Sequence, residues 1–140
     1  MRTFILIVSA MLLSHAQPAE AEITIQHLNT ASPHQGYCPV HFAFQSPSET
    51  VSKLRISFDV LDAKGTRIGS ETLTFDEKFG GTRADEGAEA SVESRTLCAS
   101  GLRLVITSAT AVVGGRQTDL LKSNLLGVRQ FKPFEIQLRK

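Results

Sequence analysis

The sequence has no tryptophan, one tyrosine, two methionines and two cysteines. Both methionines, Met1 and Met11, lie near the start, so the rest of the chain has no thioether for a soft copper site. It also lacks a Gly-x-Ser-x-Gly elbow, a glycine-rich phosphate loop and a Cys-x-x-Cys redox pair. No local spacing of serine, histidine and aspartate suggests a catalytic triad. We therefore predict that the protein is not an enzyme and uses no cofactor.

The sequence also lacks an excess of charge of one sign. Lys and Arg number 15 against 14 for Asp and Glu, which leaves a formal net charge of +1. No dense basic patch occurs with aromatic residues that could stack on bases, so we expect no nucleic-acid partner. The longest apolar run, residues 4–13, is too short to cross a bilayer as a helix, so we expect no membrane insertion.

The first residues have the features of a secretory signal peptide. Arg2 precedes the apolar run, and small residues follow it. Small residues at the last and third-last positions fit cleavage after Ala21, which we prefer, and also after Ala16. We predict a signal peptide over residues 1–21, a single domain over residues 22–140 and a periplasmic or secreted location. The domain is then long enough for one modest core.

After this leader, apolar residues alternate in twos and not with the spacing of a helix. Seven or eight short strands with turn signals between them predict an all-β fold, a two-sheet β-sandwich. The strands are expected at about 23–29, 40–45, 54–60, 66–75, 88–97, 102–113 and 134–140. The predicted core residues are Ile23, Ile25, Val40, Phe42, Phe44, Leu54, Ile56, Phe58, Val60, Leu102, Leu104, Ile106, Phe134 and Ile136.

Irregular features are predicted at four places. The sequence DAKG at 62–65 is typical of a turn. A change of alternation after it predicts a β-bulge at Gly69 or Ser70. Residues 76–87 are polar and glycine-rich, so we expect a long exposed loop there. Gly114 and Gly115 predict a two-residue hairpin, because both positions accept positive φ without steric cost.

Two cysteines in an exported chain predict one disulfide. Cys38 precedes the second predicted strand and Cys98 ends the fifth, so the bridge is expected at the rims of the sheets. The histidines give the alternative: His34, Cys38 and His41 have a spacing that zinc or copper could use. A bridged Cys38 cannot be a ligand, and nothing near His27, His34 and His41 indicates that they converge. We predict no metal site, with these three as surface or rim histidines.

The segments YCPVHFAF, KLRISFDVLDAKG, TLCASGLRLVITSATAVVGG and DLLKSNLLGVRQFKPFEIQL resemble the IrmA (interleukin receptor mimic protein A) family of small exported bacterial proteins. The resemblance covers nearly all of the predicted domain. It implies a fibronectin type III or immunoglobulin-like sandwich without enzymatic activity, which binds a protein partner such as a host receptor or cytokine and serves virulence. The usual buried tryptophan and tyrosine corner of such sandwiches are missing.

Our first functional hypothesis is therefore an exported protein-binding module that resembles a cytokine-receptor-mimicking effector. The apolar C-terminal segment LLKSNLLGVRQF, residues 120–131, has more leucines than a plain connection needs, which predicts a partner contact. We expect this segment and the final strand to add to a sheet edge, either in the same chain or in a second copy, and exchange of the strand between copies would make a homodimer. The residues expected at that contact are Leu125, Leu126, Val128, Phe131 and Phe134. The alternatives are a structural subunit or assembly factor of a surface appendage and, less favoured, a periplasmic metal-binding protein.

Overall fold

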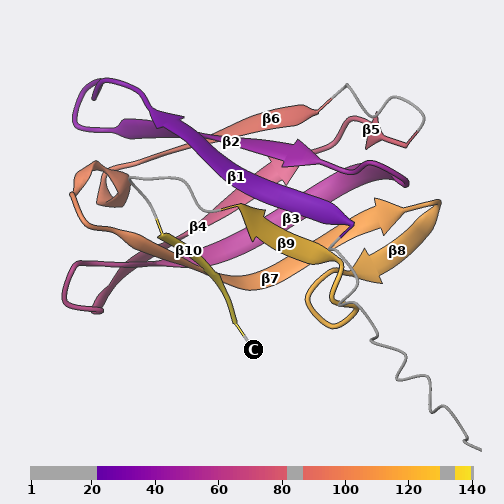
Figure 1. Cartoon of the computed structure of the whole chain (residues 1–140). Coiled ribbons are helices and arrows are strands. Elements are labelled where there is room, and N and C mark those ends of the chain that lie inside the picture. Colours follow the sequence, from indigo (N-terminus) through magenta and orange to yellow (C-terminus); the bar gives the residue numbers. More distant parts are fainter. Residues whose placement is uncertain (1–21, 82–86, 130–134, 140) are drawn as a thin grey trace, which may run out of the picture.

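The computed structural model describes residues 22–81, 87–129 and 135–139, and in them the chain forms two β-sheets packed face to face (Figure 1). The predicted signal peptide lies outside these residues. The four-stranded sheet has the order β6-β2-β1-β9. The six-stranded sheet has the order β10-β7-β3-β4. In addition, β5 pairs with β3, and β8 pairs with β7. The elements are β1 (Ile23–Thr30), β2 (Cys38–Gln45), β3 (Thr50–Leu61), β4 (Arg67–Phe75), β5 (Phe79–Gly80), β6 (Ala88–Ser94), the 3₁₀ helix η1 (Thr96–Cys98), β7 (Arg103–Val113), β8 (Arg116–Asp119), β9 (Leu126–Arg129) and β10 (Glu135–Leu138).

The predicted all-β, two-sheet sandwich is confirmed. Its ten strands exceed the seven or eight expected, because β5, β8 and β9 are too short for alternation to show them. All predicted core residues among those described are buried, including Phe42, Phe44 and Phe58. Phe134 lies outside the described residues. The rings of Phe42 and Phe58 come from opposite sheets and lie 6.0 Å apart, so aromatic packing joins the two layers.

The prediction of a long exposed loop over residues 76–87 is wrong at Phe79 and Gly80, and residues 82–86 of this range lie outside the described residues. Phe79 and Gly80 form the short strand β5 against Thr50 and Val51 of β3. The Phe79 side chain is buried, with its ring 5.7 Å from the Phe75 ring. A lone phenylalanine among polar residues shows no alternation, so the pattern could not indicate its burial.

The position of the β4 bulge and the end of the strand before Cys98 also differ from prediction. The bulge of β4 falls at Ile68, because Gly69 pairs with Val60 and Arg67 with Leu61. The strand before Cys98 stops at Ser94, and Cys98 ends η1 instead of the strand. The hairpin at Gly114 and Gly115 is confirmed, since both residues have positive φ between β7 and β8.

The last two strands join different sheets of the same chain. β9 runs parallel to β1, with Ile23 opposite Leu126, and β10 runs parallel to β7, with Ile136 opposite Leu104. Each therefore extends one layer at the same side of the sandwich (Figure 1).

The residue before β1 fastens the loop between β2 and β3. The Glu22 carboxylate accepts hydrogen bonds from the N–H groups of Ser48 (3.0 Å) and Glu49 (2.8 Å) and from the hydroxyls of Ser48 and Ser46. Burial by itself would raise the pKa of Glu22, but these hydrogen bonds outweigh it and hold the pKa below its usual value. The start of β1 is thus tied to the turn that leads into β3.

Candidate functional site

The disulfide fastens one end of the four-stranded sheet. Cys38 begins β2 opposite Ser94 of β6, and Cys98 stands on the 3₁₀ turn that follows β6. The bridge closes with a Cα–Cα distance of 5.1 Å across 60 positions of sequence. It therefore joins the start of β2 to the turn that follows the neighbouring strand β6, at the rim of the sheet as predicted, and does not cross between the sheets. Leu97 of the same turn is buried in the core.

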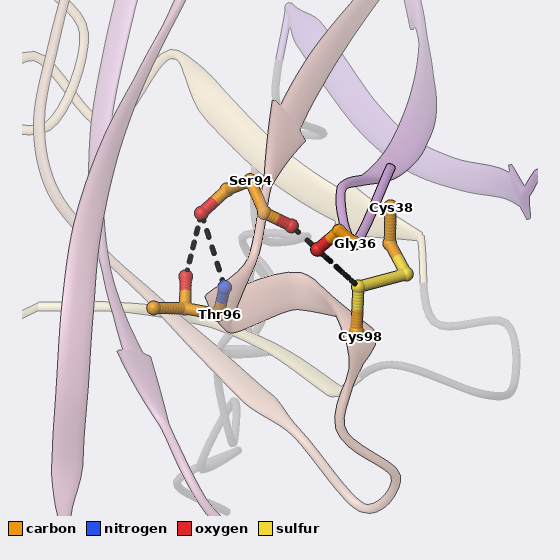
Figure 2. Close-up of a disulfide and its surroundings, with 5 residues drawn as sticks. All are labelled: Gly36, Cys38, Ser94, Thr96 and Cys98. Atoms are coloured by element: carbon orange, nitrogen blue, oxygen red, sulfur yellow. Dashed lines mark hydrogen bonds between the residues drawn. A yellow bond between two sulfur atoms is a disulfide. The ribbon is translucent and has the colours of Figure 1, made fainter. Parts of the chain in front are cut away.

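Polar contacts order the chain around this bridge, as Figure 2 shows. The Ser94 hydroxyl accepts a hydrogen bond from the Thr96 N–H (3.2 Å) and bonds to the Thr96 hydroxyl (2.9 Å). Cys98 Sγ lies 3.6 Å from the carbonyl oxygen of Gly36 and 3.8 Å from that of Ser94. A bridged sulfur carries no proton, so we interpret these last two contacts as packing. They place the β1–β2 loop directly against η1.

The tip of this loop carries an exposed aromatic residue. His34 and Tyr37 exchange two backbone hydrogen bonds of 2.9 Å around Gln35 and Gly36, both of which have positive φ. This tight turn holds Tyr37 just before Cys38, with 41% of its surface exposed. The Arg95 guanidinium carbon lies 5.0 Å from the centre of the Tyr37 ring, which is a cation–π contact. This pair is not predictable from the sequence, because 58 positions separate the two residues and only β2–β6 pairing brings them together.

The three histidines occupy different environments. His34 is exposed in the tight turn, and His41 lies half-buried on the outer side of β2, as its alternation predicted. The prediction of a surface or rim position is wrong for His27, which is 1% exposed. Its Nε2 lies 3.2 Å from the Thr30 hydroxyl, and its ring lies 6.1 Å from Phe42. In β1 it follows the inward positions Ile23 and Ile25, so strand phase puts the imidazole in the core.

The described residues contain no group of three or more histidine, cysteine, aspartate or glutamate side chains that could hold a metal ion. Cys38 and Cys98 are bridged, which removes both thiolates. The spacing of His34, Cys38 and His41 therefore does not correspond to a cluster of ligands in the structure.

Burial determines the ionisation of His27. Loss of water lowers its pKa below the ordinary value, a backbone hydrogen bond at Asn29 opposes this, and the charge of His41 adds to the lowering. The imidazole is therefore neutral in the folded protein at neutral pH.

We predict that His27 makes the folded state less stable in mild acid. The unfolded histidine takes up a proton near pH 6.5, whereas the buried one does so only at lower pH. Between these values the unfolded state binds more protons, so the free energy of unfolding falls as the pH falls. His27→Phe should flatten this part of the profile, as measured by urea unfolding between about pH 7.5 and 5. Parallel profiles for the two proteins would contradict the assignment.

The structure places the described residues of the predicted partner contact inside this chain. Leu126 is 4% exposed in β9, and Leu125 and Val128 pack partly buried against the core. Phe131 and Phe134 lie outside the described residues. A groove of about 990 Å³ opens beside Leu126, where β8 and β10 both pair with β7 and leave Thr107 and Ser108 between their ends. Its apolar lining comes from Leu120, Leu121, Leu126 and Leu138.

The comparison with protein families gives a match over residues 23–128, from the first residue of β1 to the third residue of β9. The matching family is described as IrmA, interleukin receptor mimic protein A. The chain belongs to the IrmA family. The matched region includes both cysteines, β1 to β8 in full and the first three residues of β9, so the family likeness extends over most of the sandwich.

A solved structure supports the fold of this IrmA family member. It is described as the structural characterization of IrmA from Escherichia coli, and the match has a TM-score of 0.63. It is 21% identical and covers 79% of this chain and 93% of that chain. At this identity the likeness concerns the fold alone. A search of the curated proteins found no match. Within the described residues, no helix is long and apolar enough to span a membrane.

Proposed function

We propose that this IrmA family member is exported and acts as a non-enzymatic protein-binding module that mimics a cytokine receptor. The observation that carries the proposal is the family match, because the description of that family is a receptor mimic. The expected partner is a host cytokine or receptor. Binding of an interleukin by this protein is the decisive test of the proposed function.

Export is supported by two independent features. The disulfide between Cys38 and Cys98 needs an oxidising compartment, and the first residues have the pattern of a signal peptide. The proposed location is therefore the periplasm or the medium. Absence of catalysis is inferred from the sequence, which has no Gly-x-Ser-x-Gly elbow, no glycine-rich phosphate loop and no Cys-x-x-Cys redox pair.

Binding is tested with the oxidised chain of residues 22–140 against a panel of immobilised interleukins, measured by biolayer interferometry. We expect saturable binding to at least one interleukin with a Kd of about 1 μM or tighter, as for specific protein complexes. Serum albumin on the same surface gives the background. Failure of every interleukin to bind at about 50 μM protein would refute the proposal.

The appendage-subunit alternative has weaker support. Such a subunit needs an incomplete sheet that a strand from another chain completes. Here β9 already pairs with β1, and β10 already pairs with β7 within the chain. Fractionation separates the two ideas, because a subunit would be recovered in sheared fibres and a module as a soluble species.

We also propose a homodimer formed through the C-terminal strand. β10 is a four-residue edge strand, and a copy of it from a second chain could make the same parallel pairing with β7. We expect a dimer in sedimentation velocity at about 100 μM, and a monomer for a chain truncated before Phe131. Wild-type protein that sediments only as a monomer would contradict the dimer.

A further inference from the structure

The outer faces of the two sheets differ in the ion pairs that their charged side chains form. The ion pairs among the described residues all involve the six-stranded sheet: Arg67–Asp59 (3.0 Å), Arg139–Asp59 (3.2 Å), Arg55–Asp76 (2.8 Å) and Arg103–Glu135 (3.4 Å). Several charges on that face, including Asp59 and Arg55, are therefore neutralised by neighbours within the chain. Side chains that are already paired within the chain add little to the free energy of binding a partner.

Among the described residues, the centre of the outer face of the four-stranded sheet has no aspartate, glutamate, lysine or arginine side chain. Along β2 and the residue before it, Tyr37, Pro39, His41 and Ala43 alternate with the buried side chains and so point away from the core. On β1, Gln26 lies opposite Ala43 on the same face. Depletion of charged residues at the centre and aromatic enrichment are features of protein interfaces.

Charged residues line the edges of this same face. Glu89 and Glu93 of β6 are exposed and lie opposite Ala43 and Pro39. Arg129 of β9 lies opposite Gln26. Among the described residues, none of these three takes part in an ion pair, whereas Asp59 and Arg55 of the six-stranded sheet do. Their charges are available for complementary groups on a partner. Glu89 and Glu93, four positions apart on one strand, make the β6 edge negative.

Two exposed apolar residues extend the face at the disulfide end. Leu28, 40% exposed, is the bulge residue of β1, between His27 and Asn29. Tyr37 is 41% exposed, and the Arg95 guanidinium stacks on its ring while other N–H groups remain able to donate. Tyrosine and arginine are enriched among the residues that dominate binding energy. The tight turn and the disulfide hold this pair in place before binding, which reduces the entropy cost of association.

We propose that the outer face of the four-stranded sheet is the surface that receives the protein partner, with Tyr37 as its anchor. This inference rests on the proposed function. The partner is a folded protein whose contact patch is apolar at its centre and carries lysine or arginine opposite Glu89 and Glu93. Arg95 takes a carboxylate beside the tyrosine.

Three variants test the face with an interleukin that the wild-type protein binds in the panel. Tyr37→Ser should weaken binding about 10-fold or more through loss of the anchor, and Tyr37→Phe should retain most of the affinity because the ring remains. Glu93→Lys should also weaken binding about 10-fold at low salt, with a smaller effect in about 0.5 M NaCl. The control is Thr72→Lys/Thr74→Lys on exposed positions of β4, which adds the same charge to the opposite sheet and should change affinity less than about 2-fold.

The outcomes separate the surface from the function. Binding that survives Tyr37→Ser and Glu93→Lys, or that the β4 variant weakens equally, would overturn the surface while the proposed function stands. Absence of wild-type binding to every interleukin would overturn both. Circular dichroism and thermal unfolding of each variant confirm that a loss of binding is not a loss of fold.

Discussion

Replacing Cys38 and Cys98 together with alanine is expected to lower the free energy of unfolding by about 4 kcal/mol. The bridge spans 60 positions, so its removal releases a long loop in the unfolded chain and raises that state's entropy. A domain of this size is folded by only about 5 to 15 kcal/mol. The variant should therefore be close to the limit of stability at 37 °C, as measured by denaturant unfolding.

The control for this prediction is the wild-type protein under reducing conditions. Dithiothreitol should bring its unfolding midpoint close to that of the double variant, because both lack the same constraint. Both cysteines are replaced, since a single substitution would leave one thiol free to form bridges between chains. A loss of less than about 1 kcal/mol would show that the bridge contributes little to stability.

Leu120→Ala is expected to lower the free energy of unfolding by about 3 kcal/mol. Leu120 is 0% exposed although it belongs to the apolar segment that the sequence analysis assigned to partner contact. Its N–H donates to the Ala109 carbonyl (2.8 Å), and its own carbonyl accepts from the Leu125 N–H (3.0 Å). These bonds prevent the backbone from closing the cavity that the smaller side chain leaves.

The adjacent residue supplies the matched control. Leu121 is only partly buried against the core, so Leu121→Ala should cost about 1 kcal/mol or less. If both substitutions cost the same small amount, Leu120 would not be a core residue. A variant that unfolds normally but loses its partner would support the original assignment of this segment to binding.

Much of the sandwich could be predicted from side-chain alternation. Val40, Phe42 and Phe44 alternate with polar or small residues, and each is buried in β2 as expected. The same holds for the apolar positions of β3 and β7, whose regular strands are long enough for a period of two to be visible. The disulfide was predictable as well, because two cysteines allow only one intrachain pairing.

Short elements were not predictable in this way. β5 has two residues and β9 has four, which is too few for a pattern, so the sequence favoured a loop for Phe79 and left open whether Leu126 adds to a sheet edge of its own chain or of a second copy. The burial of both side chains depends on pairing with strands distant in sequence, β3 for Phe79 and β1 for Leu126. His27 shows a related limit, since strand phase placed it inward but its residue type favoured the surface.

The sequence by itself determined the all-β class, the two-layer core, the disulfide and the resemblance to a receptor-mimicking family. These depend on residue type and on the local alternation of apolar residues, both of which are visible in the sequence. Only the tertiary structure decided that the C-terminal leucines contribute to their own domain, that Arg95 stacks on Tyr37 and that the ion pairs among the described residues all involve the six-stranded sheet. Each of these depends on which strands become neighbours, and strand pairing joins residues that the linear order keeps far apart.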